Sequence, residues 1–312
     1  MRSQIVKDPL PYVAIFSAHV IWAVNSVVAK ITIQEIPVMS LQFAKFSIAF
    51  LLLSPFLFSY FKKHTFHKKH LTLLLLTTLC MITINNALGY TGLLYTGAIE
   101  SSLLGLFLPL TSIVIGWLFF KEKIFRINLV GMLIGFTGAC IVLGLPFLLA
   151  GSIATSKLIG DILVLLSGIA VVLGFMFSKE LVKTYPPLVI ATLTFGIGAI
   201  SFFLPSIVEY KIDPGWISKV GTGGIMGFLY IVFLATTVGY LLLVWAVKRA
   251  NVSQANLFHY IEPAVTATVA IPLLGESISP SFLIGAVLVV AGVYFGTMGK
   301  SIHHVFHKGQ QT

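Results

Sequence analysis

Residues 98–124 read AIESSLLGLFLPLTSIVIGWLFFKEKI, and residues 252–278 read VSQANLFHYIEPAVTATVAIPLLGESI. The two stretches align without a gap at a constant offset of 154 positions, and the alignment continues to residues 142 and 296. Each stretch holds an apolar run close to the roughly 20 residues that a helix needs to cross a bilayer. The identical pairs include Pro, Glu and Gly residues that chance rarely places in one register: Leu103/Leu257, Pro109/Pro263, Glu122/Glu276, Ile124/Ile278, Leu129/Leu283, Gly131/Gly285 and Gly138/Gly292. The chain therefore contains an internal repeat of membrane-spanning segments.

The composition indicates lipid surroundings. Of the 312 residues, 57% are hydrophobic and 10% are charged, and the mean hydropathy is +1.00. An ordinary soluble domain carries about 25% charged residues. Residues 48–61 and 71–84 contain no ionised side chain. A protein core of this size cannot enclose so much apolar surface, so the sequence predicts an all-α integral membrane protein.

The charged residues and cysteines exclude several classes of partner. The formal net charge is +10, but the lysines lie in short loops and form no basic soluble domain, so a nucleic-acid partner is not expected. Cys80 and Cys140 both fall inside apolar segments, and there is no CxxC motif. Neither a disulfide framework nor a thiolate metal site is indicated. The sequence predicts no cofactor and no metal ion.

Charged or turn-rich breaks divide the chain into ten apolar segments. The first segment is too long and too polar for the core of a signal peptide, since it includes His19, Asn25 and Lys30. The short connections leave no room for a soluble catalytic domain. The predicted spans are 11–33, 38–60, 71–95, 98–120, 127–149, 158–179, 188–208, 222–247, 251–274 and 281–299.

The distribution of lysine and arginine predicts the orientation, because positively charged loops stay in the cytoplasm. With a cytoplasmic N-terminus, 15 of the 20 basic residues fall in cytoplasmic segments and 3 fall in outer loops. The remaining two, Lys30 and Lys45, lie within spans. One missed span would scramble this alternation. Both termini are therefore predicted to be cytoplasmic.

The repeat divides the chain into two five-helix halves, residues 1–150 and 155–312. A weaker similarity at an offset of 149 pairs Lys30 with Lys179 and Pro37 with Pro186. Since five is an odd number, the second half must enter the membrane from the opposite face. Inverted repeats suit alternating access, because two similar halves can open to opposite sides. The predicted architecture is ten transmembrane helices in two inverted five-helix repeats.

The repeated stretches also resemble a known family. Residues 98–109 follow A-x-E-S-S-L-L-G-L-F-L-P, residues 117–124 read WLFFKEKI, and residues 131–138 follow G-x-x-x-G-x-x-G. Residues 253–278 form the second copy, from SQANLFHYIEP to GESI. These motifs resemble the EamA-type branch of the drug/metabolite transporter superfamily, and the resemblance covers essentially the whole chain. It implies a central bundle of helices 1–4 and 6–9, with helices 5 and 10 at the periphery.

Two prolines and one carboxylate mark the expected binding site. Pro109 and Pro263 interrupt matching spans, and matched proline-interrupted segments indicate the midplane site of a carrier. Glu262 precedes Pro263 near the middle of its span, where an acidic group costs on the order of 3 kcal/mol and usually faces a cavity or a partner. His259 and Asn256 lie on the same helical face. The alternative is a structural Glu–His pair and harmless kinks in packed helices.

Other polar and aromatic side chains are expected to face the same interior. Lys45 lies about 10 Å into its span at 1.5 Å per residue. It could pair with Glu262, meet a substrate carboxylate, or extend its stem to outer water. The further candidates are His19 and Trp22 in the first span, Asn86 and Tyr90 in the third, and Tyr240 in the eighth.

The remaining repeated residues are interpreted as scaffold. Glu122 and Glu276 end the fourth and ninth spans, where local contacts at a helix end are expected. The repeated glycines are expected to let helices approach closely: Gly131, Gly135, Gly138, Gly285 and Gly292.

These features favour a secondary transporter rather than an enzyme or a channel. We expect a multi-pass protein of the cytoplasmic membrane, which in bacteria is the inner membrane. We expect it to export a small metabolite such as an amino acid. Its expected partners are membrane lipid and, if it is not a monomer, a second copy in a homodimer. No phosphate-binding loop for nucleotide is present, so coupling would be to protons through Glu262 or absent. The alternatives are a multidrug or organic-cation carrier, given Glu262 and 25 Phe, and a phosphorylated-sugar or nucleotide-sugar carrier.

Overall fold

The computed structural model describes residues 9–121, 125–150, 155–247 and 256–308. These residues form helices joined by short loops, and no strand occurs among them. Apolar segments adopt helices because in hydrocarbon only internal hydrogen bonds satisfy the backbone. The helices up to residue 150 are α1 (Leu10–Thr32), α2 (Val38–Phe61), η1 (Lys68–His70), α3 (Leu71–Thr78), η2 (Leu79–Ile84), α4 (Asn85–Tyr95), α5 (Ala98–Gly105), α6 (Leu108–Phe120) and α7 (Arg126–Ala150). Those that follow are α8 (Thr155–Thr184), α9 (Pro187–Ile212), α10 (Trp216–Lys219), α11 (Thr222–Leu229), η3 (Tyr230–Val238), α12 (Gly239–Val247), η4 (Asn256–Ile261), α14 (Glu262–Leu274) and α15 (Pro280–Lys308).

The helices carry the apolar surface of a protein embedded in a membrane. Seven helices of the described residues are long and apolar enough to cross a bilayer, and three further apolar helices are shorter. Large apolar side chains point outward from them, with Leu51, Phe136, Ile200 and Leu204 all at least 65% exposed. Water would not stabilise such a surface, whereas acyl chains do. The chain is a multi-pass membrane protein.

The predicted spans overlap these helical stretches along the described chain. α1, α2 and α7 begin and end within one residue of the predicted bounds. α8 and α15 continue beyond the predicted ends at 179 and 299, to Thr184 and Lys308. Hydropathy marks only the apolar part of a helix, whereas backbone hydrogen bonds continue into the polar interface. The number of membrane crossings and the side on which each terminus lies stay predictions.

Helices α2 and α9 pack along each other in opposite directions. At one end, the Glu209 carboxylate of α9 accepts a hydrogen bond of 2.7 Å from the backbone N–H of Ser40, at the start of α2. Further along, Phe46 of α2 contacts Phe195 of α9. The contact positions rise along one helix as they fall along the other, so the two helices are antiparallel.

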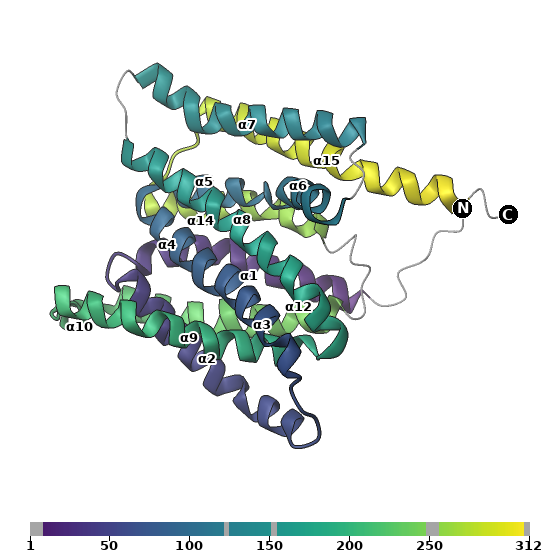
Figure 1. The fold of residues 1–312 in the computed structure, drawn as a ribbon. Coiled ribbons are helices and arrows are strands. Elements are labelled where there is room, and N and C mark those ends of the chain that lie inside the picture. Colours follow the sequence, from purple (N-terminus) through teal and green to yellow (C-terminus); the bar gives the residue numbers. More distant parts are fainter. Residues whose placement is uncertain (1–8, 122–124, 151–154, 248–255, 309–312) are drawn as a thin grey trace.

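Helices α7 and α15 form a second antiparallel pair, at one edge of the bundle (Figure 1). Gly138 lies against Gly285, and Gly135 lies against Gly292. A Cβ atom added to Gly138 would lie 2.7 Å from the carbonyl oxygen of Gly285, which is too close for any side chain. The repeated glycines therefore allow these two backbones to touch, in the role that the sequence suggested for them.

The two spans that contain the matched prolines Pro109 and Pro263 are interrupted at these residues. α5 ends at Gly105 and α6 begins at Leu108, so that Pro109 is the second residue of α6. Pro263 holds the same place in α14, directly after the 3₁₀ segment η4. A proline ring is compatible with the first turn of a helix but clashes inside one. Each of these spans is therefore built from two helical pieces.

Glu276 has a different role from the predicted local contact. Its carboxylate accepts hydrogen bonds from the backbone N–H groups of Ala98 (2.6 Å) and Ile99 (3.0 Å), at the start of α5. The first N–H groups of a helix lack partners within the helix, so a carboxylate from a distant segment can cap them. The sequence did not indicate this contact, because Glu276 and Ala98 are 178 positions apart. The equivalent Glu122 lies outside the described residues.

Candidate functional site

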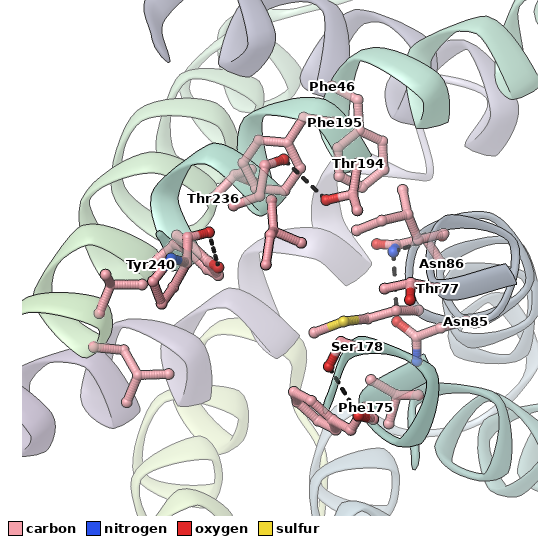
Figure 2. Close-up of a pocket in the computed structure, with 18 of the residues that line it drawn as sticks. Phe46, Thr77, Asn85, Asn86, Phe175, Ser178, Thr194, Phe195, Thr236 and Tyr240 are labelled. Atoms are coloured by element: carbon pink, nitrogen blue, oxygen red, sulfur yellow. Dashed lines mark hydrogen bonds between the residues drawn. The ribbon is translucent and has the colours of Figure 1, made fainter. Parts of the chain in front are cut away.

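A cavity of about 560 Å³ lies between α1–α4, including η2, on one side and α8, α9, η3 and α12 on the other. Figure 2 shows Asn85 and Asn86 across this cavity from Thr236 and Tyr240. A largely apolar cavity with a few convergent polar groups is typical of a small-molecule site. Its polar lining residues are Lys45, Thr77, Asn85, Asn86, Ser178, Thr194, Thr236 and Tyr240, and its aromatic ones include Trp22, Phe46, Phe175 and Phe195.

Lys45 is the one charged residue among the described residues that line this cavity. The residue is 3% exposed, and its ammonium group donates a hydrogen bond of 2.9 Å to Oδ1 of Asn86. The Nζ atom also lies 4.3 Å from the ring centroid of Phe46 and 4.6 Å from that of Tyr90. Aromatic faces and an amide oxygen stabilise a cation only in part. The cavity thus contains a buried lysine amine without a carboxylate partner among the described residues.

Two of the roles considered for Lys45 are excluded by this geometry. Lys45 takes part in no ion pair among the described residues, and Glu262 pairs with histidines instead. Its stem does not extend to outer water either, because the residue is buried. One helical turn earlier, the buried amide of Gln42 has no hydrogen-bond partner within the described part of the chain. Of the roles considered, contact with a substrate carboxylate remains a prediction.

Two wide helical turns place polar groups at the cavity wall. The π-helical segments η2 and η3 belong to the third and eighth helical stretches. In η2 the carbonyl oxygen of Ile82 accepts a hydrogen bond of 2.8 Å from the amide of Asn86. In η3 the carbonyl oxygen of Ala235 accepts one of 2.9 Å from the indole of Trp22. π-helical turns are frequent at functional sites, because they redirect side chains and carbonyl groups.

The cavity lining repeats between the two halves of the chain. Lys45 and Phe46 are 149 positions before Thr194 and Phe195, the offset that also relates Pro37 to Pro186, and all four line the cavity. Asn86 is 154 positions before Tyr240, the offset of the fourth and ninth spans, and both line the cavity as well. Thr194, Phe195 and Phe175 were missing from the predicted site. The repeat offset applied to Lys45 and Phe46 would have indicated the first two.

A second polar cluster lies next to Trp22, outside the cavity. It consists of His19, His259 and Glu262. Nδ1 of His19 lies 2.6 Å from Oε1 of Glu262, and Nδ1 of His259 lies 3.0 Å from the same oxygen. The two imidazole centroids are 4.3 Å apart, and the His19 ring meets the edge of Trp22 at 5.6 Å. None of the three lines the cavity. The sequence predicted that these residues and Lys45 face one interior, but only Lys45 lines the cavity.

The break before α14 explains the position of Glu262. Because η4 ends at Ile261, Glu262 is the first residue of α14, where the helix dipole favours a negative charge. Thr266, one turn later, donates a hydrogen bond of 3.0 Å to the carbonyl oxygen of Ala23 and joins α14 to α1. The side chain of Asn256, which the sequence grouped with Glu262, lies outside the described residues.

Most of the remaining predicted residues line the cavity, and the others lie outside it. Trp22, Lys45, Asn86 and Tyr240 line the cavity, whereas Tyr90 contacts Lys45 from behind it. Tyr240 donates a long hydrogen bond of 3.4 Å to the carbonyl oxygen of Pro187. Pro109 and Pro263 do not reach the cavity, because the fourth and ninth stretches contribute no described lining residue.

Polar contacts join the helices at the far end of the bundle. Lys157 of α8 forms an ion pair of 2.7 Å with Glu100 of α5. The buried Asp161 of α8 accepts a hydrogen bond from the hydroxyl of Thr96, and Lys30 of α1 donates one of 3.0 Å to the carbonyl oxygen of Leu93. The cavity extends the other way, past Ser178 and Val182 to Pro187. These contacts tie α1, α4, α5 and α8 together at the end of the bundle away from Pro187.

An all-helical bundle with apolar outer faces and a central, partly polar cavity defines a class: a multi-pass membrane transporter for small molecules. The chain belongs to the EamA-like transporter family, whose sequence profile matches residues 10–144 and again residues 158–298. This finding confirms the resemblance seen in the motifs. The chain is a transporter and not an enzyme.

Individual relatives support the same assignment. The uncharacterized transporter YyaM of Bacillus subtilis is 28% identical, covering 67% of each chain. An uncharacterized transporter of Archaeoglobus fulgidus is 24% identical over 89% of this chain and 93% of its own length. The uncharacterized transporter YoaV of Bacillus subtilis is 23% identical over 91% of this chain and 95% of its own length. A solved crystal structure shares the fold with a TM-score of 0.57 at 13% identity, covering 92% of this chain and 96% of that one.

Proposed function

We propose that this chain is a secondary transporter that exports a small metabolite bearing a carboxylate, such as an amino acid, by alternating access. Ten spans would form two inverted halves, residues 1–150 and 155–312, with both termini in the cytoplasm. The antiparallel packing of α2 on α9 and of α7 on α15 supports the inversion, because each pair joins corresponding helices of the two halves. The start of α1 and the end of α15 lie toward the same side in Figure 1, as ten crossings require.

The observation that carries the substrate class is the buried ammonium group of Lys45. Hydrogen bonds that involve a charged group stabilise by about 1.5–3 kcal/mol. A substrate carboxylate that joins Lys45 and Asn86 would complete a charge-assisted contact that the protein alone leaves incomplete. The rings of Phe46, Phe195 and Trp22 supply an apolar wall for the rest of the substrate. An α-amino group could bond hydroxyl groups such as those of Thr194 and Thr236.

The same charge disfavours the alternative substrates. A lipophilic cation would have to enter beside Lys45 with no described carboxylate on the cavity wall. Phosphorylated sugars and nucleotide sugars carry two or more negative charges, and sites for them use several cationic groups, often Arg. Lys45 alone suits a single carboxylate.

The predicted orientation places the cavity on the cytoplasmic side of the protein, as an exporter needs for loading. With cytoplasmic termini, the end of α8 and the start of α9 lie toward the cytoplasm, and the cavity extends to them. The tied end with Lys157 and Glu100 then faces outward. Such a conformation is ready to load a substrate from the cytoplasm. Glu262 and its two histidines would carry a coupling proton, since they link α1 to α14 beside the cavity.

Counterflow in proteoliposomes tests the substrate class. Vesicles loaded with an unlabelled solute would be tested for uptake of the same solute in radiolabelled form. The panel would include amino acids, the corresponding amino-acid amides, organic cations and sugar phosphates. We expect saturable counterflow for at least one carboxylate and at least about tenfold less for its amide, the loss of one charge-assisted contact. Counterflow of cations or sugar phosphates alone would refute the proposal.

A further inference from the structure

The group of His19, His259 and Glu262 has a geometry suited to more than hydrogen bonding. Each residue offers one atom that can bind a metal ion, and these three atoms lie within 4.8 Å of one another. They come from α1, near the start of the chain, and from the consecutive helices η4 and α14. His19 is 2% exposed, so its ring position is held by packing. The three ligand atoms therefore converge on one small space.

The charge of this group favours a cation. Both imidazole Nδ1 atoms approach one oxygen of Glu262, and no lysine or arginine pairs with Glu262 among the described residues. With neutral histidines, the group carries one negative charge in a largely buried place. A bound cation offsets the negative charge of Glu262.

The donor set indicates which cation. Calcium and magnesium prefer oxygen ligands, whereas zinc and its neighbours bind imidazole nitrogen together with a carboxylate. Zinc bonds of about 2.0–2.1 Å in a tetrahedron place neighbouring ligand atoms about 3.3 Å apart. The two N···O distances are 2.6 and 3.0 Å and all three ligand atoms lie within 4.8 Å of one another, so shifts of no more than about 1.5 Å would give this spacing. The side chain of His259 is 40% exposed, which leaves a fourth position open to water.

We propose that His19, His259 and Glu262 bind one divalent transition-metal ion of the zinc class, with water as the fourth ligand. The metal takes the place of the protons that lie between Nδ1 of each histidine and Glu262, and these protons move to Nε2 or to solvent. A bound ion would tie α1 to η4 and α14. Neither the motifs nor the two cysteines pointed to such a site, because its ligands are 243 positions apart in the sequence.

Metal binding to the purified full-length protein in detergent tests the proposal. Protein stripped with a chelator would be titrated with Zn²⁺ by calorimetry and with Co²⁺ by visible absorption, which reports tetrahedral nitrogen and oxygen ligands. We expect one ion per chain. His19→Gln and Glu262→Gln should each weaken binding at least about tenfold, since even the loss of an outer-shell partner costs 10–100-fold.

Two further variants keep the result interpretable. His259→Gln alters a half-exposed ligand and preserves packing if His19→Gln fails to fold. His64→Gln changes a histidine of the exposed 62–70 loop and should leave the affinity unchanged. The absence of saturable binding would overturn the proposal, as would affinities in His259→Gln and Glu262→Gln that both equal that of the unaltered protein. The assay measures no transport, so its outcome leaves the proposed substrate class untouched, whereas a bound ion would take the place of the coupling proton proposed for Glu262.

Discussion

Phe46 of α2 and Phe195 of α9 meet in the cavity wall with ring centroids 5.6 Å apart, and they are 149 positions apart in the sequence. Each ring belongs to a buried cluster at the contact of the two helices. Because the helices are antiparallel, the pair lies on the axis that would relate the two halves. Any rocking of one half against the other must slide or break this contact.

Removal of either ring should therefore weaken the contact between the halves. Aromatic pairs contribute about 0.5–1.5 kcal/mol beyond their area burial. A double-mutant cycle of Phe46→Leu and Phe195→Leu, followed by unfolding in detergent, should give a coupling energy of about 1 kcal/mol. The matched cycle pairs Phe46→Leu with Phe136→Leu, whose side chain is 66% exposed on α7, and should show strict additivity. Additivity in both cycles would remove the special role of the contact.

Lys45→Met should strongly reduce transport while preserving the fold. The substitution removes the charge that would bind a carboxylate, and a loss of about 10- to 100-fold in counterflow is expected from the energy of a charge-assisted hydrogen bond. The unfolding temperature should stay the same or rise, because a buried charge without a carboxylate partner costs free energy. Lys62→Met in the exposed loop is the control. Normal counterflow in Lys45→Met would show that the substrate binds elsewhere.

Glu262→Gln should remove the dependence of transport on a proton gradient. The amide keeps the shape of the carboxylate and can still accept hydrogen bonds from His19 and His259, but it carries no charge. Uptake driven by a pH step in proteoliposomes should fall to the level without a gradient, while counterflow at equal pH continues. If the variant inserts correctly and pH-driven uptake is unchanged, Glu262 has no coupling role.

Gly138→Leu should disrupt the packing of α7 on α15. The new side chain would overlap the backbone of Gly285, and overpacking typically costs about 1–3 kcal/mol. Thermal unfolding in detergent should occur at a clearly lower temperature. Gly105→Ala is the matched control, because a Cβ atom there would meet no neighbour within 4 Å. Equal stability of the two variants would contradict the close approach of these helices.

Composition and charged breaks were sufficient to predict an all-helical membrane protein, because apolar runs and charged breaks reflect the bilayer directly. α1, α2 and α7 agree with the prediction within one residue. The site was harder to predict. Glu262 was predicted at the binding site because a carboxylate in the middle of a span is rare. It lies in a group with His19 and His259 rather than on the cavity wall. Depth in a span can be read from sequence, but the direction of a side chain depends on helix rotation.

Rotation and distant pairing explain the other differences. The π-helical turns η2 and η3 shift Asn86 and Ala235 around their helix axes. No local sequence pattern predicted these π-helical turns. The cap that Glu276 forms on α5 joins residues 178 positions apart, so a local reading could not find it. Thr194 was within reach, since the repeat relates it to Lys45.

Two-sided accessibility of Thr194 tests alternating access most directly. A Thr194→Cys variant, with Cys80 and Cys140 replaced by Ala, would be labelled by a membrane-impermeant maleimide in inside-out and in right-side-out vesicles. We predict labelling from both faces, slowed in each case by the transported carboxylate. Labelling from a single face under all conditions, or labelling that the substrate does not slow, would contradict a carrier built around this cavity.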